Sequence, residues 1–194
     1  LERCFYLESH VNLSISAKNR LIFALDVPDR KEDESYVRAL GDIVGCFKVG
    51  LELFIKEGPD VLKTVKQNSS ASIFLDLKLH DIPATVRSAL RSAATHGVRF
   101  ITVHVSDGGS ILQTANEVKD LGLEVLAVTV LTNVSESELG GLGYKENLSL
   151  RQLVLDRANV AKESGCAGVV CSGEEVALIK RTCSNHFKVV VPGI

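Results

Sequence analysis

Seven short apolar runs, separated by amphipathic stretches, constrain the fold of this 194-residue chain more than any other feature. Each run is rich in β-branched residues and apolar along most of its length, which is typical of strands buried on both faces of a parallel sheet. Repeated strand–helix units build either an open doubly wound sheet or a closed (β/α)8 barrel. The predicted strands span residues 21–27, 46–51, 72–78, 100–105, 124–131, 168–171 and 188–191.

The barrel is the better of these two folds for this sequence. No G-x-G-x-x-G string follows the first run, which disfavours a dinucleotide-binding open sheet. We therefore predict an α/β protein with a (β/α)8 TIM barrel over residues 20–194 as a single domain, and residues 1–19 as an N-terminal extension or tag remnant. Such barrels usually take about 250 residues, so the last β-α unit is expected to be missing. Seven strands alone would leave two exposed sheet edges.

The stretches between the runs carry helix signals. One helix is predicted to begin near Pro83, because a proline in the first turn loses no hydrogen bond, and to stop at Gly97. Ser135 and Glu138 have the spacing of a capping box for a short extra helix. Further helices are predicted around residues 37–44, 59–65, 111–118 and 149–164.

The composition argues against several classes of protein. The formal net charge is -2 and the sequence pI is about 6.2, so there is no basic footprint for nucleic acid. No apolar run approaches the ~18–20 residues of a membrane helix. The 5 cysteines include no C-x-x-C pair, so free thiols are expected rather than disulfides or a zinc site. These features predict a cytoplasmic protein that binds no nucleic acid, membrane or metal.

Charged residues lie at the ends of the first three predicted strands. Asp26 is in the first run, Lys48 in the second, Asp76 and Lys78 close the third, and Asp81 follows in its loop. Active sites of barrels lie at the C-terminal ends of the strands, and residues two apart in a strand share a face. We therefore expect Asp76 and Lys78 to point together into the barrel mouth. There, alternating charges on Lys48, Asp76, Lys78 and Asp81 would offset the cost of burying each ion.

Each of these residues also has an ordinary structural interpretation. A single Asp or Lys at a strand end is usually a solvated loop residue, and Asp81, just before Ile82 and Pro83, could cap the next helix. His104 could line the pocket or be a satisfied rim histidine, and His80 should point away from its charged neighbours. The convergence of four charges on one face of a barrel favours a functional site.

The run D-L-K-L-H-D-I-P at residues 76–83 resembles a motif of the bacterial orotidine 5'-phosphate decarboxylases. Four shorter strings resemble the same family, in the same order and at similar spacing: A-L-D at 24–26, K-V-G at 48–50, V-L-T at 130–132 and V-P-G-I at 191–194. The resemblance implies a homodimeric TIM barrel that uses no cofactor. It also implies decarboxylation of orotidine 5'-phosphate to UMP, the last step of de novo pyrimidine synthesis.

The resemblance implies a role for each residue of the site. Lys78 would protonate C6 of the pyrimidine as CO2 leaves, Asp76 would lie beside the departing carboxylate, and Lys48 would hold the network and contact the ribose. Asp81 would reach into the partner subunit's site. The other substrate-binding residues implied are Asp26 at a ribose hydroxyl, Ile82 and Thr85 beside Asp81, Thr132 at the pyrimidine amide edge, and Pro192 and Gly193 after the last strand.

The family's phosphate-binding arginine would follow Ile194, so a protein that ended there is expected to lose most of its activity. Two rival functions remain open. Related barrels such as 3-keto-L-gulonate 6-phosphate decarboxylase share the D-x-K string but use Mg2+ and typically carry Glu at the position of Lys48, where a lysine would repel the metal. The other rival is a non-enzymatic dimerising or ligand-binding module. Mg2+-dependent activity would favour the first, and binding of UMP analogues without CO2 release would favour the second.

Overall fold

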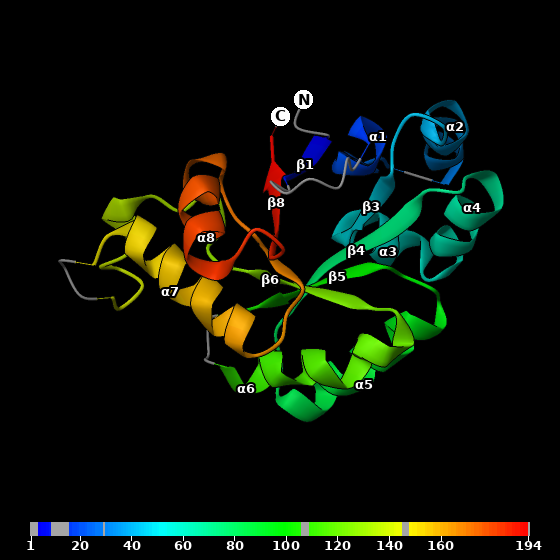
Figure 1. Cartoon of the computed structure of the whole chain (residues 1–194). Coiled ribbons are helices and arrows are strands. Elements are labelled where there is room, and N and C mark those ends of the chain that lie inside the picture. Colours follow the sequence, from blue (N-terminus) through cyan, green and yellow to red (C-terminus); the bar gives the residue numbers. More distant parts are fainter. Residues whose placement is uncertain (1–3, 9–15, 29, 106–108, 145–147, 194) are drawn as a thin grey trace.

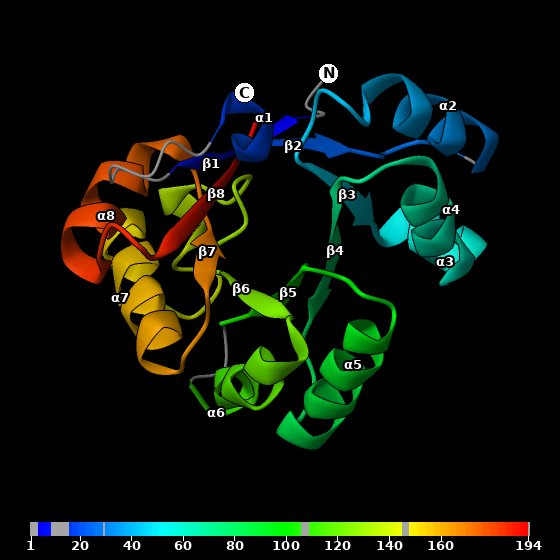
Figure 2. The same cartoon turned by 45° about the vertical axis from the view of Figure 1, so that its right-hand side comes forward.

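The structure is a computed structural model that describes residues 4–8, 16–28, 30–105, 109–144 and 148–193, with side chains described from residue 16 onward. Within these residues, eight strands form one closed barrel in the order of the chain. Helices lie on the outside of the ring of strands (Figures 1 and 2). The strands are β1 (Cys4–Glu8), β2 (Leu21–Ala24), β3 (Cys46–Gly50), β4 (Ser72–Leu79), β5 (Phe100–His104), β6 (Glu124–Val128), β7 (Gly168–Val170) and β8 (Lys188–Pro192).

Most of the helices connect successive parallel strands. None of the described helices is both long enough and apolar enough to cross a membrane. The α-helices are α1 (Ala17–Arg20), α2 (Arg30–Leu40), α3 (Leu51–Glu57), α4 (Asp60–Asn68), α5 (Pro83–Thr95), α6 (Gly109–Leu112), α7 (Leu150–Glu163) and α8 (Val176–Cys183), and the 3-10 segments are η1 (Gln113–Leu121), η2 (Glu136–Glu138) and η3 (Gly173–Glu175).

The predicted parallel barrel is confirmed: all seven apolar runs form strands, β2 to β8, and each pairs in parallel with the next. The predicted strand at 46–51 ends one residue early because α3, which was not predicted, begins at Leu51. α8 was not predicted either. The capping box is confirmed, since the Ser135 N–H donates to Glu138 Oε2 at 2.7 Å.

β1 occupies the position between β2 and β8 and runs antiparallel to both. Phe5 pairs with Ile22 of β2 and with Pro192 of β8, so the main chain of β1 satisfies both neighbouring edges. The seven parallel strands therefore do not leave the two open edges expected from the sequence. The division at residue 19 stays a prediction, although β1 lies within the predicted extension and closes the barrel.

The helix α5 shows how local sequence sets the elements around the site. Pro83 is at its first position, and Val86, Leu90 and Ala93 form its buried face. Gly97 follows its end with a φ of 61°, a left-handed conformation that glycine adopts without a steric penalty. Pro83 thus starts α5 directly after the β4 loop that carries Asp81, and Gly97 follows its end.

Apolar side chains form one layer between strands and helices and a second inside the barrel. The outer cluster includes Leu75 of β4, with Leu77 and Leu79 packed against it, so these leucines face the helices as predicted. The inner cluster fills the barrel beneath its mouth. Its buried members are Ile22, Ala24, Cys46, Phe74, Phe100, Leu126 and Val190.

Candidate active site

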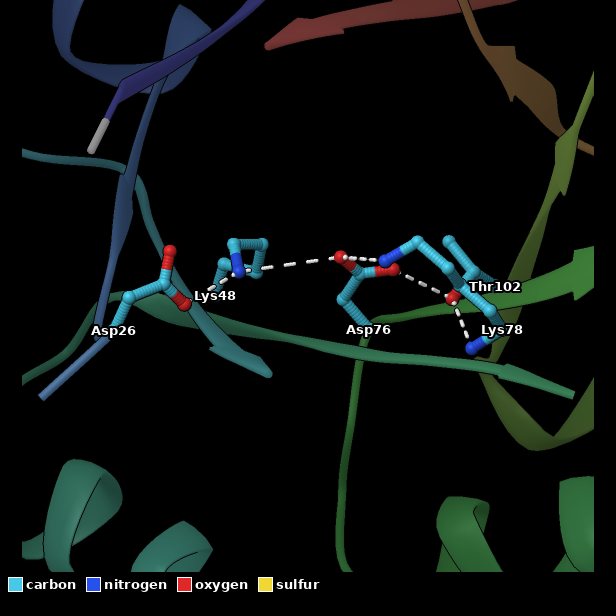
Figure 3. Close-up of polar contacts among 5 residues, drawn as sticks. All are labelled: Asp26, Lys48, Asp76, Lys78 and Thr102. Carbon is cyan, nitrogen blue, oxygen red and sulfur yellow. Dashed lines mark hydrogen bonds and ion pairs between the residues drawn. The ribbon is translucent and has the colours of Figure 1, made fainter. Parts of the chain in front are cut away.

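A polar layer lies directly above this inner apolar layer. On β3, β4 and β5, and just past the end of β2, the residue two positions beyond an inner apolar residue is polar. Alternate residues of a strand point to the same face. These pairs are Ala24 and Asp26, Cys46 and Lys48, Phe74 and Asp76, and Phe100 and Thr102. Figure 3 shows the four polar side chains together with Lys78.

Asp26, Lys48, Asp76 and Lys78 form a row of alternating charge, called here the charge row. Lys48 Nζ lies 2.8 Å from Asp26 Oδ1 and 3.9 Å from Asp76 Oδ2, and Lys78 Nζ lies 2.8 Å from the same Asp76 oxygen (Figure 3). Gly50 leaves room for the first pair, because a Cβ there would stand 3.2 Å from both Asp26 Oδ1 and Lys48 Nζ. The prediction that Asp76 and Lys78 meet at the mouth is thus matched by the geometry.

Burial is graded along the charge row. The side chains of Lys48 and Asp76 are 6% and 8% exposed, whereas those of Asp26 and Lys78 are 48% and 33% exposed. Each buried ion therefore has an opposite charge on both sides, which is the arrangement that offsets desolvation. The ammonium of Lys78 is held against a buried carboxylate and remains accessible from the mouth, so it can meet a bound molecule.

Residues 19–194 match the Orotidine 5'-phosphate decarboxylase / HUMPS family. The chain belongs to this family. It is 44% identical over 182 residues to the orotidine 5'-phosphate decarboxylase of Carboxydothermus hydrogenoformans, covering 90% of this chain and 75% of that protein. It is 45% identical over 186 residues to that of Desulfosudis oleivorans, covering 93% and 74%.

Solved structures of relatives have the same fold. The crystal structure of orotidine 5'-phosphate decarboxylase from Lactobacillus acidophilus matches with a TM-score of 0.76 and 35% identity, over 86% of this chain and 77% of that one. An uncharacterized conserved protein from Geobacillus kaustophilus matches with a TM-score of 0.79 and 37% identity, over 87% and 80%. The barrel predicted from the sequence is therefore the fold of the family.

Asp81 lies apart from the charge row within one chain. Its Oδ1 accepts a hydrogen bond from the Ile82 N–H at 2.6 Å, and the Asp81 and Ile82 side chains are exposed. The alternating row predicted from the sequence ended in Asp81, but in the structure its fourth member is Asp26. α5 has no side-chain cap hydrogen bond, so the capping interpretation of Asp81 is also wrong.

The remaining predicted residues are spread around the mouth. Thr85 is exposed on α5, and Thr132 is exposed beside a cavity of about 180 Å³ that Glu175 also lines. Pro192 ends β8 and pairs with β1, and Gly193 follows it with a φ of 78°. These four residues are not joined to the charge row by any described hydrogen bond.

A second cavity, of about 320 Å³, lies at the C-terminal ends of β4 and β5. Its lining includes His80 and His104, whose ring centroids are 5.7 Å apart, and Arg157, which donates to the Thr129 carbonyl and to the Tyr144 hydroxyl. Burial, followed by the charges of His80, Lys78 and Arg157, lowers the pKa of His104. The surroundings of His104 at the rim thus favour its neutral form.

Two residues of the mouth were missed from the sequence. Arg157 lies in α7, far from any strand end, and nothing in its local sequence marks it. Thr102 could have been found, because it follows Phe100 of the inner layer by two residues, as Asp76 follows Phe74.

Proposed function

We propose that the charge row carries out the decarboxylation of orotidine 5'-phosphate to UMP without a cofactor. The observation that carries the proposal is the Lys78 ammonium, 2.8 Å from the buried carboxylate of Asp76 and open to the barrel mouth. Membership of the family and the D-L-K-L-H-D-I-P run support this reaction over others that a barrel can host.

The reaction requires a cation close to C6 of the pyrimidine. When the bond between C6 and the carboxylate breaks, its electron pair stays on C6 in the plane of the ring, where the π system cannot delocalise it. A preorganised ammonium stabilises this developing charge and then donates its proton to C6, which leaves UMP and CO2. Lys78 takes this role, and solvent restores the proton to its amine.

The other members of the charge row hold Lys78 and the substrate. Asp76 lies beside the leaving carboxylate and fixes the direction of the Lys78 ammonium through their 2.8 Å contact. Lys48 and Asp26 bind ribose hydroxyls, and their mutual contact of 2.8 Å orients both. Asp76 already faces two ammonium groups, so the site disfavours the Mg2+ ion of the sugar-phosphate decarboxylases.

Thr132 contacts the amide edge of the pyrimidine, and Pro192 and Gly193 line the side of the mouth near the end of β8. Thr132 is exposed at a cavity, which supports contact with a ligand. Gly193 has a φ of 78°, a conformation that favours glycine, and as a glycine it has no side chain to fill the mouth. The reaction is placed in the cytoplasm, where pyrimidine synthesis supplies the substrate.

Two copies of the chain form a homodimer in which Asp81 reaches into the partner's site, with Ile82 and Thr85 beside it. Asp81 is exposed and separate from the charge row of its own chain, which supports a role across an interface. Large apolar side chains are also exposed: Ile82, next to Asp81, is 66% exposed, and Leu51 and Ile55 of α3 are 47% and 77% exposed. Mixing Asp81→Ala with Lys78→Ala tests the arrangement, because only a shared site regains about a quarter of the parent activity in random hybrids.

The test of the proposed reaction is CO2 release and UMP formation from orotidine 5'-phosphate, with and without a metal chelator. We expect turnover that the chelator leaves unchanged, and none with 3-keto-L-gulonate 6-phosphate. Turnover of the sugar phosphate that stops on chelation would overturn the proposal. Binding of UMP without any CO2 release would instead indicate a non-catalytic binding module.

A further inference from the structure

We propose that Thr102 is a positioning residue that sets the geometry of both Lys78 and Asp76 for the reaction. The role rests on the proposed function, since it concerns the same two groups. Thr102 is fully buried in β5, opposite the end of β4. The Thr102 hydroxyl contacts Lys78 and Asp76. These contacts are needed because the backbone of β4 is irregular at these residues.

The β4–β5 ladder is irregular at the charge row. Leu75 pairs with Ile101 and Leu79 pairs with Val103, so three residues of β4 (Asp76, Leu77 and Lys78) face the single residue Thr102. Such a bulge bends its strand and interrupts the main-chain ladder, and it can re-aim a side chain. At this place the direction of Lys78 is therefore not set by regular strand geometry.

Lys78 itself has a φ of 50°, in the left-handed region that residues with a side chain rarely adopt. Its neighbours must hold it there, because the strained conformation relaxes if nothing opposes the change. The Lys78 N–H donates to Thr102 Oγ1 at 2.9 Å, which replaces the ladder bond lost in the bulge. The threonine hydroxyl is thus the partner that anchors the strained residue.

The same hydroxyl donates its own proton to Asp76 Oδ1 at 2.8 Å (Figure 3). The two oxygens of Asp76 therefore have separate partners: Oδ1 takes the Thr102 hydroxyl, and Oδ2 takes the Lys78 ammonium. A carboxylate held at both oxygens cannot rotate, so its second oxygen stays aimed at Lys78. The Thr102 hydroxyl thus fixes both the backbone of Lys78 and the plane of the Asp76 carboxylate.

The matched variants are Thr102→Val, which keeps the shape of the side chain and removes the hydroxyl, and Thr102→Ser, which keeps the hydroxyl. Thr114→Val is the control, because Thr114 is also buried and donates to a carbonyl, that of Ile111, in the helical layer away from the mouth. For each protein, kcat and KM for orotidine 5'-phosphate, the thermal midpoint and the hydrogen exchange of the Lys78 amide are measured.

We expect Thr102→Val to lower kcat by about 10²-fold, the size of effect caused by misplacing a reacting group by about 1 Å, with KM changed less than threefold. Thr102→Ser should recover kcat to within about fivefold of the parent, and Thr114→Val should match the parent. The Lys78 amide should lose protection in Thr102→Val alone. Equal kcat in the Val and Ser variants, or a protected Lys78 amide in Thr102→Val, would overturn the proposal.

The proposed function and this inference can fail separately. If the parent releases no CO2, the proposed function is wrong, and exchange of the Lys78 amide then decides the anchoring role by itself. Loss of protection in Thr102→Val with retention in Thr102→Ser supports the anchor, whereas equal protection in both variants rejects it.

Discussion

The two sides of this barrel are held by different means. On the side of β3, β4 and β5, parallel strands carry a layer of buried, paired charges and a hydroxyl that bonds to two of the charged residues. On the opposite side, β1 joins β2 to β8 through an antiparallel main-chain ladder; this junction is called here the seam. The first side depends on specific side chains, so substitutions there should alter activity. The seam depends on backbone pairing, so changes to β1 should alter stability.

On the charged side, Asp76→Asn is expected to cause a large loss of activity. The change removes the charge that pairs with Lys78 at 2.8 Å and with Lys48 at 3.9 Å, so both ammonium groups lose their shared buried partner. We expect kcat to fall by roughly 10³-fold, the upper range for the loss of one preorganised electrostatic contact. Steady-state CO2 release measures kcat. A loss of less than tenfold would show that the charge of Asp76 is not needed for the reaction.

At the seam, deletion of residues 1–8 should reduce stability rather than alter chemistry. It removes β1 and leaves the edges of β2 and β8 unpaired, a template for aggregation. We expect the thermal midpoint to drop by roughly 5–10 °C, which corresponds to about 2–4 kcal/mol for a chain of this size. Tyr6→Pro, which removes one main-chain donor from β1, should produce a smaller drop. An unchanged midpoint with no self-association would contradict the closure by β1.

A buried carboxylate in the helical layer lacks the partners that Asp76 has. Asp33 of α2 is fully buried, and neither of its oxygens has a hydrogen-bond partner among the described residues. Burial raises its pKa from 3.8 to about 6, against a smaller opposing effect of Arg30. Between about pH 4 and pH 6, Asp33 therefore keeps its proton in the folded protein but loses it in the unfolded chain. The free energy of unfolding falls as the pH rises through this range and stays lower above it.

Asp33→Asn removes this penalty. We expect the variant to be more stable than the parent above pH 6, by on the order of 2–3 kcal/mol for a shift of about two pKa units, and similar to it near pH 4. Denaturant unfolding at pH 4.5 and pH 7.5 measures the difference. An equal difference at both pH values would mean that ionisation of Asp33 is not its cause.

The smallest effect concerns buried thiols on both sides. Burial raises the pKa of Cys46 and of Cys171 to about 12, and both are free. Neither should react with a thiol reagent in the native protein at neutral pH, because the thiolate is the nucleophile. In the protein that lacks residues 1–8, both thiols should react faster, because each residue pairs with a strand of the seam: Cys46 with Ile22 of β2 and Cys171 with Val190 of β8. Rates equal to those of the parent would contradict an opening of the seam.

The parts of the fold that follow from side-chain pattern could be predicted from the sequence. Apolar runs located β2 to β8, and charges at strand ends located Asp26, Lys48, Asp76 and Lys78. β1 was predicted to be part of an N-terminal extension, although residues 4–7 are apolar. Its place in the barrel depends on pairing with β2 and β8, which are distant in the sequence, and so does not follow from the local pattern. α3 was missed because the apolar run continues from β3 across the helix start at Leu51.

Within the site, the approach of Lys78 to Asp76 was predicted from regular strand alternation, but the structure reaches it through a bulge and a left-handed residue. Spacing alone does not reveal such an irregularity, which arises from tertiary pairing with β5. Arg157 was missed for a related reason: it reaches the mouth from α7 and is located only by its contacts with Thr129 and Tyr144.

The most direct test is the turnover number of Lys78→Ala beside the parent and beside Lys63→Ala, which removes an exposed lysine whose ion pair, among the described residues, is with Asp60 on α4. The account predicts that Lys63→Ala releases CO2 from orotidine 5'-phosphate at the parent rate. Lys78→Ala should fall to about one-thousandth of that rate or less, since it loses both the cation and the proton donor. Equal rates for the parent and Lys78→Ala, in proteins with the same thermal midpoint, would contradict the assignment of Lys78 as the proton donor.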